Sequence, residues 1–354
     1  MSRFFSSKFQ ALTPYTPGEQ PKDTQYVKLN TNESPFPPSE RVAKSAAAAA
    51  AGLQLYNDPT CSALSKKLAE TLGVEADEVL LTNGTDEILN FAFMAFCDKD
   101  HPAAFADITY GFYKVFAALN GVPYTEIPLD DNYNIRVEDY LSLGKTVFIA
   151  NPNAPTGKAL ELCDIERIVA SNPDHVVVID EAYVDFGAES AVKLIRKYDN
   201  LLVTQTFSKS RSLAGGRLGF GVGSRALIRD LNTIKYSTNP YNVNSMTQAA
   251  GLAALEDEAQ TKANCAVIRE NRAYTSNALT ALGFSVLESK ANFVFAKSVQ
   301  ISGLSLYQQL KARGVLVRHF ETPRLKDYNR ITIGTKAQMD ILLQNVREIL
   351  EEQS

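Results

Sequence analysis

The chain has 354 residues, of which 45% are hydrophobic and 21% are charged, and its formal net charge at pH 7 is −4. This composition is typical of a soluble globular protein with one large domain and a smaller one. No apolar run approaches the ~20 residues that span a bilayer, and Lys and Arg form no block. We therefore expect neither a membrane protein nor a nucleic-acid-binding protein.

Cysteine and histidine are sparse and scattered. The four cysteines show no CxxC pairing, and there are only three histidines. We therefore expect no metal site, no disulfide framework and no histidine-based catalytic triad. Unpaired thiols suit a reducing cytoplasm, and the N-terminus shows no signal-peptide core with a cleavage site, so we expect a cytoplasmic protein.

The first 40 residues are rich in Pro, Asn, Ser and Thr and predict an extended arm. Two helical patterns follow between about residues 44 and 72. Short apolar runs then alternate with helical patterns, which predicts a mainly parallel sheet with both faces buried. The predicted strands are Val79–Thr82, Pro102–Ala106, Thr146–Ala150, His175–Ile179 and Leu201–Thr204, with LGFGVG as one more strand, and the helices include Asp86–Phe96 and Phe112–Asn120.

The pattern changes near residue 245. A long helical region, Gln248–Leu282, is followed by alternating strands and helices: Phe284–Leu287, Phe293–Ala296, Leu304–Arg313, Val315–Arg318, Arg330–Ile333 and Lys336–Glu352. We predict an α/β fold. It comprises an N-terminal arm (residues 1–40) packing with the small domain, a large domain (41–245) with a mainly parallel doubly wound sheet, and a smaller α+β C-terminal domain (246–354).

Polar residues that follow the predicted strands are candidates for a site, because ligands bind outside the carboxyl ends of strands in open α/β sheets. Gly84, Thr85 and Asp86 form a glycine turn into a helix whose free N–H groups can bind phosphate, although an ordinary turn capped by Asp86 has the same pattern. Tyr110 can stack on a planar ring or pack in the core. The NPNAPTG run predicts a rigid turn with one cis X-Pro bond, and an asparagine there can hydrogen-bond a phenolic oxygen.

Two further strand ends carry more specific chemistry. Asp180 ends a buried apolar strand and requires a cationic partner, which a protonated pyridine nitrogen can be. Tyr183 can reach the ring oxygen. In TQTFSKSRSLAGGRLGFGVG, the Lys209 amine can form a Schiff base with an aldehyde, while Ser208 and Arg217 can hold a phosphate. Each motif alone is weak, but together they predict a site for pyridoxal 5'-phosphate.

These motifs, in this order, resemble those of the fold-type I aminotransferases, and most closely the histidinol-phosphate aminotransferase family. The resemblance covers nearly the whole chain, with the blocks PYTPGEQP, LNTNESPFPPS, LYNDP, TNGTDEI, TYGFY, NPNAPTG, VIDEAY, TFSKSRSLAGGRLGF, ANFVF, GVLVRHF and RITIGT. It implies that Lys209 forms the Schiff base with the cofactor and moves the substrate proton. It also implies that Asp180 pairs with the pyridine nitrogen, Tyr183 contacts the ring oxygen and Tyr110 stacks on the ring.

The resemblance assigns the remaining positions to phosphate and substrate. The phosphate of the cofactor would be held by the backbone of Gly84, Thr85 and Asp86 together with Thr206, Ser208 and Arg217. Tyr56 would reach the phosphate of the neighbouring subunit, which implies an obligate homodimer with shared sites. The substrate would be bound by Arg330 at its α-carboxylate, Arg318 at its distal phosphate, Asn32 from the closing arm and Tyr15 near the side chain.

Two segments depart from the family pattern. The family often has NPNNPTG, whereas Ala154 stands before Pro-Thr-Gly here, so we expect Asn153 to take over the ring-oxygen contact. The segment after Lys209 reads SRSLAGG rather than AFALAGL, which makes Arg211 and Gly216 unusual and able to alter the pocket.

The predicted activity is a ping-pong transamination in histidine biosynthesis, in which histidinol phosphate and 2-oxoglutarate give imidazole acetol phosphate and glutamate. An aromatic amino-acid aminotransferase or a threonine-phosphate decarboxylase of the same fold remains an alternative, because such relatives share the cofactor residues. A remote alternative is a non-catalytic coenzyme-binding regulatory module. That class carries an N-terminal DNA-binding extension, which we do not expect here because the sequence begins close to the arm. A dinucleotide-binding protein would need GxGxxG after the first strand.

Overall fold

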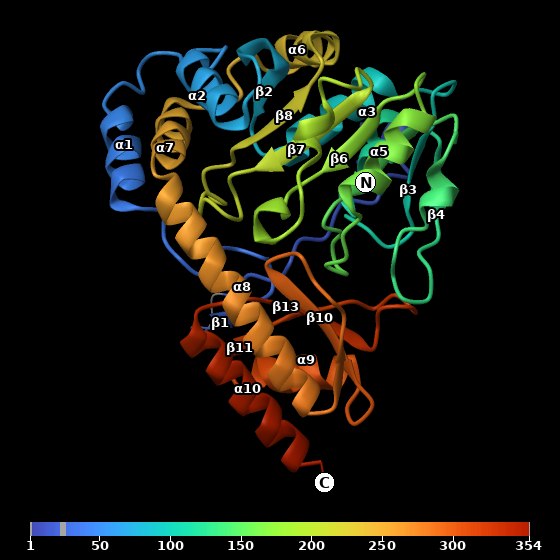
Figure 1. The fold of residues 1–354 in the computed structure, drawn as a ribbon, viewed down its shortest axis with the longest axis vertical. Helices are drawn as coiled ribbons and strands as arrows, with labels where there is room; N and C mark the ends of the chain where they lie inside the picture. Colours follow the sequence, from blue (N-terminus) through green and yellow to red (C-terminus); the bar gives the residue numbers. More distant parts are fainter. Residues whose placement is uncertain (1, 22–25, 354) are drawn as a thin grey trace.

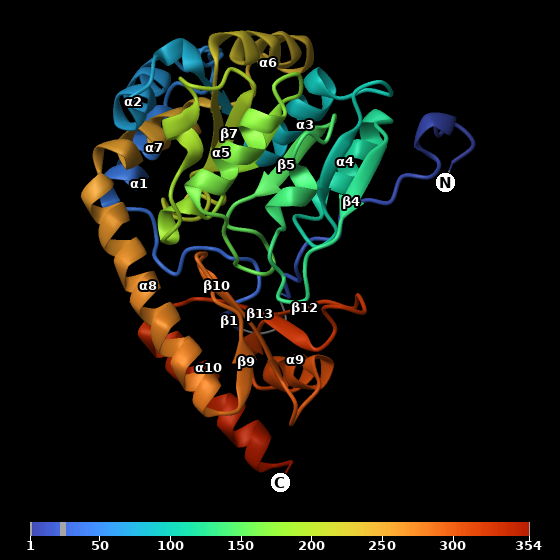
Figure 2. The same cartoon turned by 45° about the vertical axis from the view of Figure 1, so that its right-hand side comes forward.

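The computed structural model describes residues 2–21 and 26–353 and shows a larger part built on a central sheet and a smaller part beneath it (Figure 1). The long helix α8 runs along one side of the molecule from the larger part into the smaller one (Figures 1 and 2). Within the described ranges, no helix combines the length and the apolar character that a bilayer crossing requires.

The larger part contains a seven-stranded sheet in the order β2-β8-β7-β6-β5-β3-β4. All neighbouring pairs are parallel except the two that involve β8, which runs antiparallel to β2 and β7. The strands are β2 (Val79–Thr82), β3 (Ala103–Ala106), β4 (Tyr124–Ile127), β5 (Thr146–Ala150), β6 (Val177–Asp180), β7 (Leu201–Thr206) and β8 (Gly219–Gly223).

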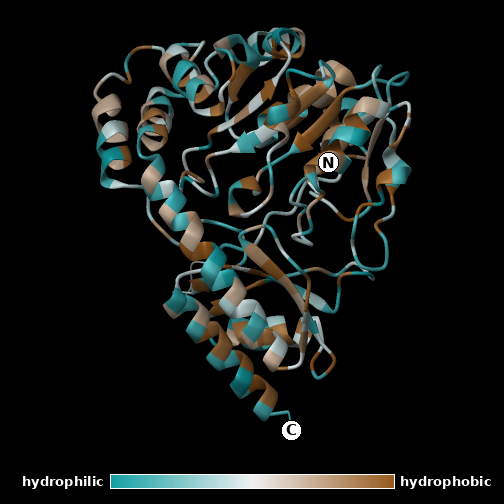
Figure 3. Cartoon of the chain, viewed as in Figure 1, coloured by the Kyte–Doolittle hydropathy of each residue, from teal (hydrophilic) through white to brown (hydrophobic). Residues whose placement is uncertain are grey.

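Both faces of this sheet are buried, as continuous apolar strands require. Alternate residues point to opposite faces of a strand, so Val147 and Ile149 pack in one core cluster while Phe148 packs in the other. The covering helices are α1 (Glu40–Ala50), α2 (Ser62–Leu72), α3 (Thr85–Phe96), α4 (Phe112–Asn120), α5 (Leu162–Ser171), α6 (Arg225–Thr238) and α7 (Ser245–Glu256). Figure 3 shows the hydrophobic colouring concentrated on the strands between these helices.

The smaller part is built on a four-stranded antiparallel sheet in the order β12-β13-β10-β9, with its own hydrophobic core. The arm joins this part through β1, which pairs in parallel with β11. The elements are β1 (Val27–Lys28), α8 (Glu258–Ala281), β9 (Phe284–Val286), β10 (Phe293–Ser298), α9 (Gly303–Ala312), β11 (Val315–Leu316), β12 (Arg318–His319), β13 (Tyr328–Thr332) and α10 (Lys336–Glu351). Short 3-10 helices are η1 (Ser7–Phe9), η2 (Ala76–Glu78), η3 (Val137–Tyr140), η4 (Val184–Phe186) and η5 (Ala191–Leu194).

The predicted fold class is confirmed, while the domain boundaries at residues 40 and 245 stay a prediction. Two expected elements were wrong in detail. The helical region Gln248–Leu282 is two helices, because Asp257 lies between them with φ −108° and ψ 39°, outside helical geometry. The strand Val315–Arg318 is divided between two sheets, since β11 pairs with the arm and β12 pairs with β13. The sequence patterns did not indicate β4, α5 or α6.

Candidate active site

A cavity of about 500 Å³ opens at the carboxyl ends of β5, β6 and β7, where the arm and the first turn of α3 also meet. This is where an open α/β sheet binds its ligands, and the volume suits one small molecule. Among the predicted site residues, the cavity is lined by Thr85, Asp86, Tyr110, Asp180, Tyr183, Thr206, Ser208, Lys209 and Arg217. The sheet topology therefore brings together residues that lie up to 132 positions apart, from 85 to 217.

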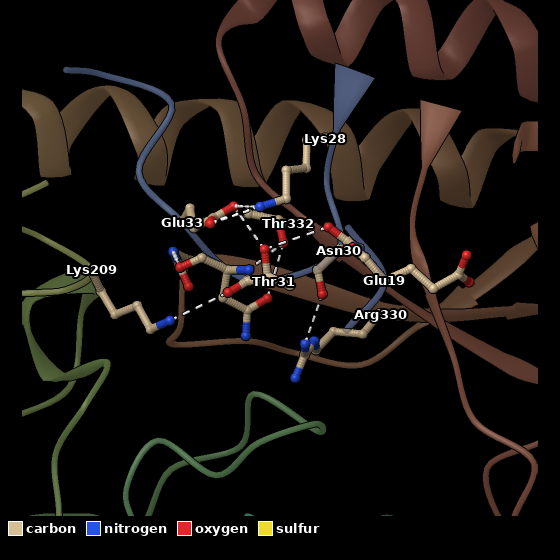
Figure 4. A network of polar contacts seen from close by, with 10 residues as sticks. Glu19, Lys28, Asn30, Thr31, Glu33, Lys209, Arg330 and Thr332 are labelled. Atoms are coloured by element: carbon tan, nitrogen blue, oxygen red, sulfur yellow. Dashed lines mark hydrogen bonds and ion pairs between the residues drawn. The ribbon is translucent and has the colours of Figure 1, made fainter. Parts of the chain in front are cut away.

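Lys209 follows β7 and extends its amine into this cavity toward the arm (Figure 4). Its Nζ donates a hydrogen bond to the carbonyl oxygen of Thr31 at 3.3 Å. Burial, together with the positive charges of Arg330 and Arg217, lowers the pKa of the amine to about 8. The neutral, nucleophilic form of the amine is thus accessible close to neutral pH.

Asp180 ends β6 at the floor of the cavity and is only 4% exposed. Its carboxylate accepts hydrogen bonds from the Tyr113 hydroxyl at 3.0 Å and the Ala182 N–H at 3.3 Å. Burial raises its pKa to about 6, because within the described chain no cationic side chain lies at ion-pair distance. A buried carboxylate of this kind is complementary to a ligand with a positive charge. Sequence reasoning missed Tyr113, which lies in the first turn of α4, three residues after Tyr110.

An anion cradle lies at the start of α3. Gly84 is the N-cap and supplies no capping side chain, so the first N–H groups of the helix can bind an anion. Arg217 lies opposite, with one guanidinium nitrogen 3.0 Å from the carboxylate of Asp86. A Cβ at Gly84 would approach Arg217 to 2.6 Å, and one at Gly219 would approach the Thr85 nitrogen to 2.4 Å. At both positions the backbone therefore lies so near its neighbours that only glycine fits without displacing them.

The two hydroxyl residues of the predicted phosphate site lie beside this cradle. The Thr206 hydroxyl donates to the Ser208 hydroxyl at 2.9 Å and accepts from the Ser208 N–H at 3.1 Å. Both side chains are buried and line the cavity. Arg217 has a φ of 52°, in the left-handed region that non-glycine residues rarely adopt, and such strain is typical of functional positions.

Tyr183 and Asn32 link the large sheet to the arm. The Asn32 side-chain amide donates to the Tyr183 hydroxyl oxygen at 3.0 Å, and its oxygen accepts from the Thr332 hydroxyl at 3.0 Å. Asn32 also has a left-handed φ of 56°. Burial raises the pKa of Tyr183. The phenol therefore stays protonated and able to donate to an oxygen in the cavity.

Tyr110 and Tyr15 form an aromatic wall. The Tyr110 hydroxyl donates to Asp86 at 2.6 Å, while burial and the charge of Asp86 raise the pKa of this tyrosine. Tyr15 comes from the arm and stacks on Phe112 with ring centroids 4.2 Å apart. A planar group entering the cavity would meet this wall.

A second cavity of about 720 Å³ adjoins the first, and both are lined by Thr31, Tyr110, Tyr183 and Lys209. Arg318 on β12 and Arg330 on β13 line it as direct cross-strand partners. Both guanidinium groups lie over the ring of Phe320, at 5.6 and 5.8 Å from its centroid. The buried Nε of Arg330 has no hydrogen-bond partner within the described ranges.

Three predicted residues line neither cavity: Gly84, which is the N-cap of α3, Asn153 and Tyr56. Asn153 lines neither cavity; its amide donates to the Ile108 carbonyl at 2.9 Å and accepts from the Thr109 hydroxyl at 2.8 Å. The structure therefore gives no support for a ring-oxygen contact by Asn153, because its side chain is engaged by Ile108 and Thr109 after β3 and by Thr156 within the turn. That turn has two cis X-Pro bonds rather than one, at Pro152 and Pro155. Tyr56 is 84% exposed and faces outward, stacked on Tyr241.

The groups around the first cavity match pyridoxal 5'-phosphate in chemistry. A buried amine is available for the aldehyde, a buried carboxylate for the pyridine nitrogen, and an uncapped helix start with an arginine and two hydroxyls for the phosphate. The glycines of the cradle leave space that a side chain would fill. The residues present thus suit this cofactor.

Comparison with known proteins agrees with this chemistry. The model of the family "Aminotransferase class I and II" matches residues 24–346. The chain is 47% identical over 353 residues to the histidinol-phosphate aminotransferase of Brachyspira hyodysenteriae, covering 99% of this chain and 100% of that protein. It is 49% identical over 346 residues to that of a Marinomonas species, covering 97% and 98%. The structure of histidinol-phosphate aminotransferase from Sinorhizobium meliloti in complex with pyridoxal-5'-phosphate has the same fold, with a TM-score of 0.90 at 22% identity over 100% and 99% of the two chains.

Proposed function

The chain belongs to the class I and II aminotransferases, and we propose that it transfers the amino group of histidinol phosphate to 2-oxoglutarate, giving imidazole acetol phosphate and glutamate. Pyridoxal 5'-phosphate is its cofactor. When bound, this cofactor supplies an aldehyde that bonds to amines and a ring that withdraws electrons from the substrate carbon. The protein supplies positioning, charge and a proton carrier.

The observation that carries the choice of substrate is the arginine pair at the second cavity. Arg318 and Arg330 occupy directly opposite positions on antiparallel strands. Like charges at such positions are destabilising. Burial and the charge of Arg318 lower the pKa of Arg330. An anion with more than one negative charge, placed between the two guanidiniums, would remove the repulsion and satisfy the buried Nε.

Histidinol phosphate provides such an anion, because a phosphate ester replaces the carboxylate of an ordinary amino acid. The same two arginines can bind the two carboxylates of glutamate in the other half of the reaction. The aromatic wall of Tyr15, Tyr110 and Phe112 offers a surface for the flat imidazole ring. One cavity can therefore accept both substrates in turn.

We assign the remaining roles to the residues that line the first cavity. Lys209 Nζ would accept the proton that leaves the substrate carbon and return it in the same half-reaction. Asp180 would pair with the positively charged ring nitrogen, and the Tyr183 hydroxyl would donate to the ring oxygen. The helix start at Thr85, with Arg217 and the two hydroxyls, would hold the phosphate.

The proposal is tested by following both half-reactions with histidinol phosphate, phenylalanine and phosphothreonine. We expect histidinol phosphate to react with the highest kcat/KM. Arg318→Gln should lower kcat/KM for histidinol phosphate by about 10- to 100-fold, as loss of a charge-assisted hydrogen bond of about 1.5–3 kcal/mol implies, and that for phenylalanine much less.

Arg324→Gln is the matched control, because Arg324 also lines the second cavity but already pairs with Asp107 at 2.9 Å. Arg324→Gln should change kcat/KM by the same factor for all three amino donors. Faster reaction with phenylalanine or phosphothreonine in the unmodified enzyme would contradict the proposal. So would an equal loss for every donor in Arg318→Gln.

We further propose a homodimer with shared active sites. An exposed apolar patch on the larger part supports it, with Leu53 54%, Leu55 71% and Tyr56 84% exposed beside Tyr241. Burying such a patch in a symmetric interface is the usual solution, and it would let Tyr56 reach the neighbouring cradle. We also propose a cytoplasmic location, where free thiols such as buried Cys61 and Cys97 stay reduced.

A further inference from the structure

Three consecutive residues of the arm each contact a different group of the site, and Figure 4 shows the contacts of the first two, Asn30 and Thr31. The Asn30 carbonyl accepts from the Arg330 guanidinium at 3.0 Å. The Thr31 carbonyl accepts from Lys209 Nζ at 3.3 Å, and the Asn32 amide donates to Tyr183 at 3.0 Å. A shift of this short segment would therefore move the partners of all three groups together.

Glu33 fixes the middle of this segment. The Thr31 hydroxyl donates to Glu33 Oε2 at 2.7 Å. Lys28 Nζ donates to both oxygens of the same carboxylate, at 2.7 and 2.6 Å. Lys28 lies on β1, which pairs with β11 of the smaller part. A continuous chain of contacts thus runs from the small domain through Lys28, Glu33 and Thr31 to the amine of Lys209.

Glu33 also lines the first cavity with Lys209, and its negative charge acts to raise the pKa of the amine. Among the residues that the structure describes, the Thr31 carbonyl is the only hydrogen-bond acceptor of Lys209 Nζ. The charged groups that act on this amine are Arg330 from β13, Glu33 from the arm, Asp86 from α3 and Arg217 before β8. Glu33 is thus the negative charge that the arm contributes opposite Arg330.

We propose that Glu33 is a positioning residue for Lys209: through the Thr31 hydroxyl it holds the Thr31 carbonyl as the acceptor of the free amine, and its charge offsets that of Arg330. The inference rests on the proposed function in taking Lys209 as the reacting amine. To carry a proton, the free amine of Lys209 would have to stay within reach of the substrate carbon. A fixed carbonyl beside the cavity keeps it there without an ion pair that would hold it too tightly.

The test measures the Lys209 amine itself in full-length protein freed of cofactor. Competitive labelling with acetic anhydride between pH 6 and 11, read by mass spectrometry of the peptide that contains Lys209, gives its pKa. We expect Glu33→Gln to lower this pKa by roughly 0.5 to 1, which is less than the ~1–3 caused by a charge within ~4–6 Å, because Glu33 is partly exposed and shares its charge with Lys28.

Lys28→Met is the matched control. It breaks the same ion pair but removes a positive charge, so the pKa of Lys209 should stay unchanged or rise. If the variants acted only by loosening the arm, the pKa of Lys209 would shift in the same direction in both. Thr31→Val keeps the carbonyl but removes the hydroxyl, and it should speed labelling of the deprotonated amine at high pH by about 2-fold or more because the carbonyl is no longer fixed.

Equal shifts in Glu33→Gln and Lys28→Met, or no shift in Glu33→Gln, would overturn the proposal. An unchanged labelling rate in Thr31→Val would overturn the part played by the hydroxyl. Thermal unfolding of each variant confirms that the labelled protein is folded. Since labelling needs neither cofactor nor substrate, a failure here is distinguishable from a failure to react with histidinol phosphate.

Discussion

Replacing Asp180 with asparagine should stabilise the cofactor-free protein and lower its affinity for the cofactor. Burial raises the pKa of Asp180 from 3.8 to about 6, a rise of about 2 that corresponds to about 3 kcal/mol. The native state therefore binds more protons than the unfolded state between about pH 4 and 6, and stability falls as pH rises through this window. Asparagine is nearly isosteric and can still accept from Tyr113.

The gain from Asp180→Asn should thus depend on pH. Without cofactor, we expect about 1 kcal/mol of added stability at pH 4.5 and at most about 3 kcal/mol at pH 7.5, measured by denaturant unfolding. With cofactor the sign reverses, because the protonated ring nitrogen loses its counter-charge. Breaking a buried charge pair costs about 2–5 kcal/mol, so cofactor affinity should fall at least about 30-fold.

Glu181→Gln separates this effect from simple removal of a buried charge. Glu181 is 1% exposed and its pKa is raised by burial to about 7, yet its carboxylate binds Ser190, Ala191 and Gln205 outside the cavity. Cofactor affinity should be unchanged in this variant. Two results would contradict this role of Asp180: a loss of cofactor binding in Glu181→Gln as large as that in Asp180→Asn, or equal destabilisation of the cofactor-free protein by Asp180→Asn at both pH values.

Three further outcomes follow from the site. Tyr113→Phe removes a 3.0 Å hydrogen bond to the cofactor-facing carboxylate, so cofactor affinity, measured by absorbance titration, should fall by about 5- to 10-fold. Gly219→Ala places a Cβ 2.4 Å from a backbone nitrogen at the start of α3 and should lower both the unfolding temperature and cofactor binding. Gly215→Ala, whose Cβ would meet no atom within 4 Å, should leave the unfolding temperature unchanged. If the protein is the proposed dimer, Tyr56→Ala should leave the folding of each subunit intact but weaken cofactor binding about 10-fold, and a normal titration curve would argue against a shared site.

The residues that carry chemistry at strand ends were predictable from sequence because the signal is local. Asp180 closes an apolar strand, and Lys209 follows another within a run of hydroxyl residues. The contacts that the arm makes with the site had no local signal in the sequence. Asn32 meets Thr332 across 300 positions, and Glu33 reaches the cavity only because β1 pairs with β11. Register between distant strands depends on packing that a single sequence pattern does not express.

The same limit explains which elements were missed. The helix Leu162–Ser171 follows directly after the proline-rich turn, so its short amphipathic pattern was not separated from the loop. The glycine-rich strand β8 was predicted, but its antiparallel direction was not, because direction depends on the path of the chain rather than on composition. The break at Asp257 lies between two segments that both have helical patterns, and no glycine or proline marks it in the sequence.

The charges of the site are unfavourable to the folded chain alone and become favourable only with ligands. Arg318 and Arg330 occupy opposite positions as like charges, and burial lowers the pKa of the Lys209 amine. Asp180 is buried with no cationic partner among the residues that the structure describes. Each arrangement costs stability in isolation. Their signs are nevertheless ordered: negative charge at the floor, and positive charge at the cradle and the second cavity. A ligand with a cationic ring and anionic groups at two ends reverses every one of these penalties at once. Strong stabilisation by cofactor and phosphorylated substrate together, greater than either gives alone, is therefore a direct consequence of this distribution of charge.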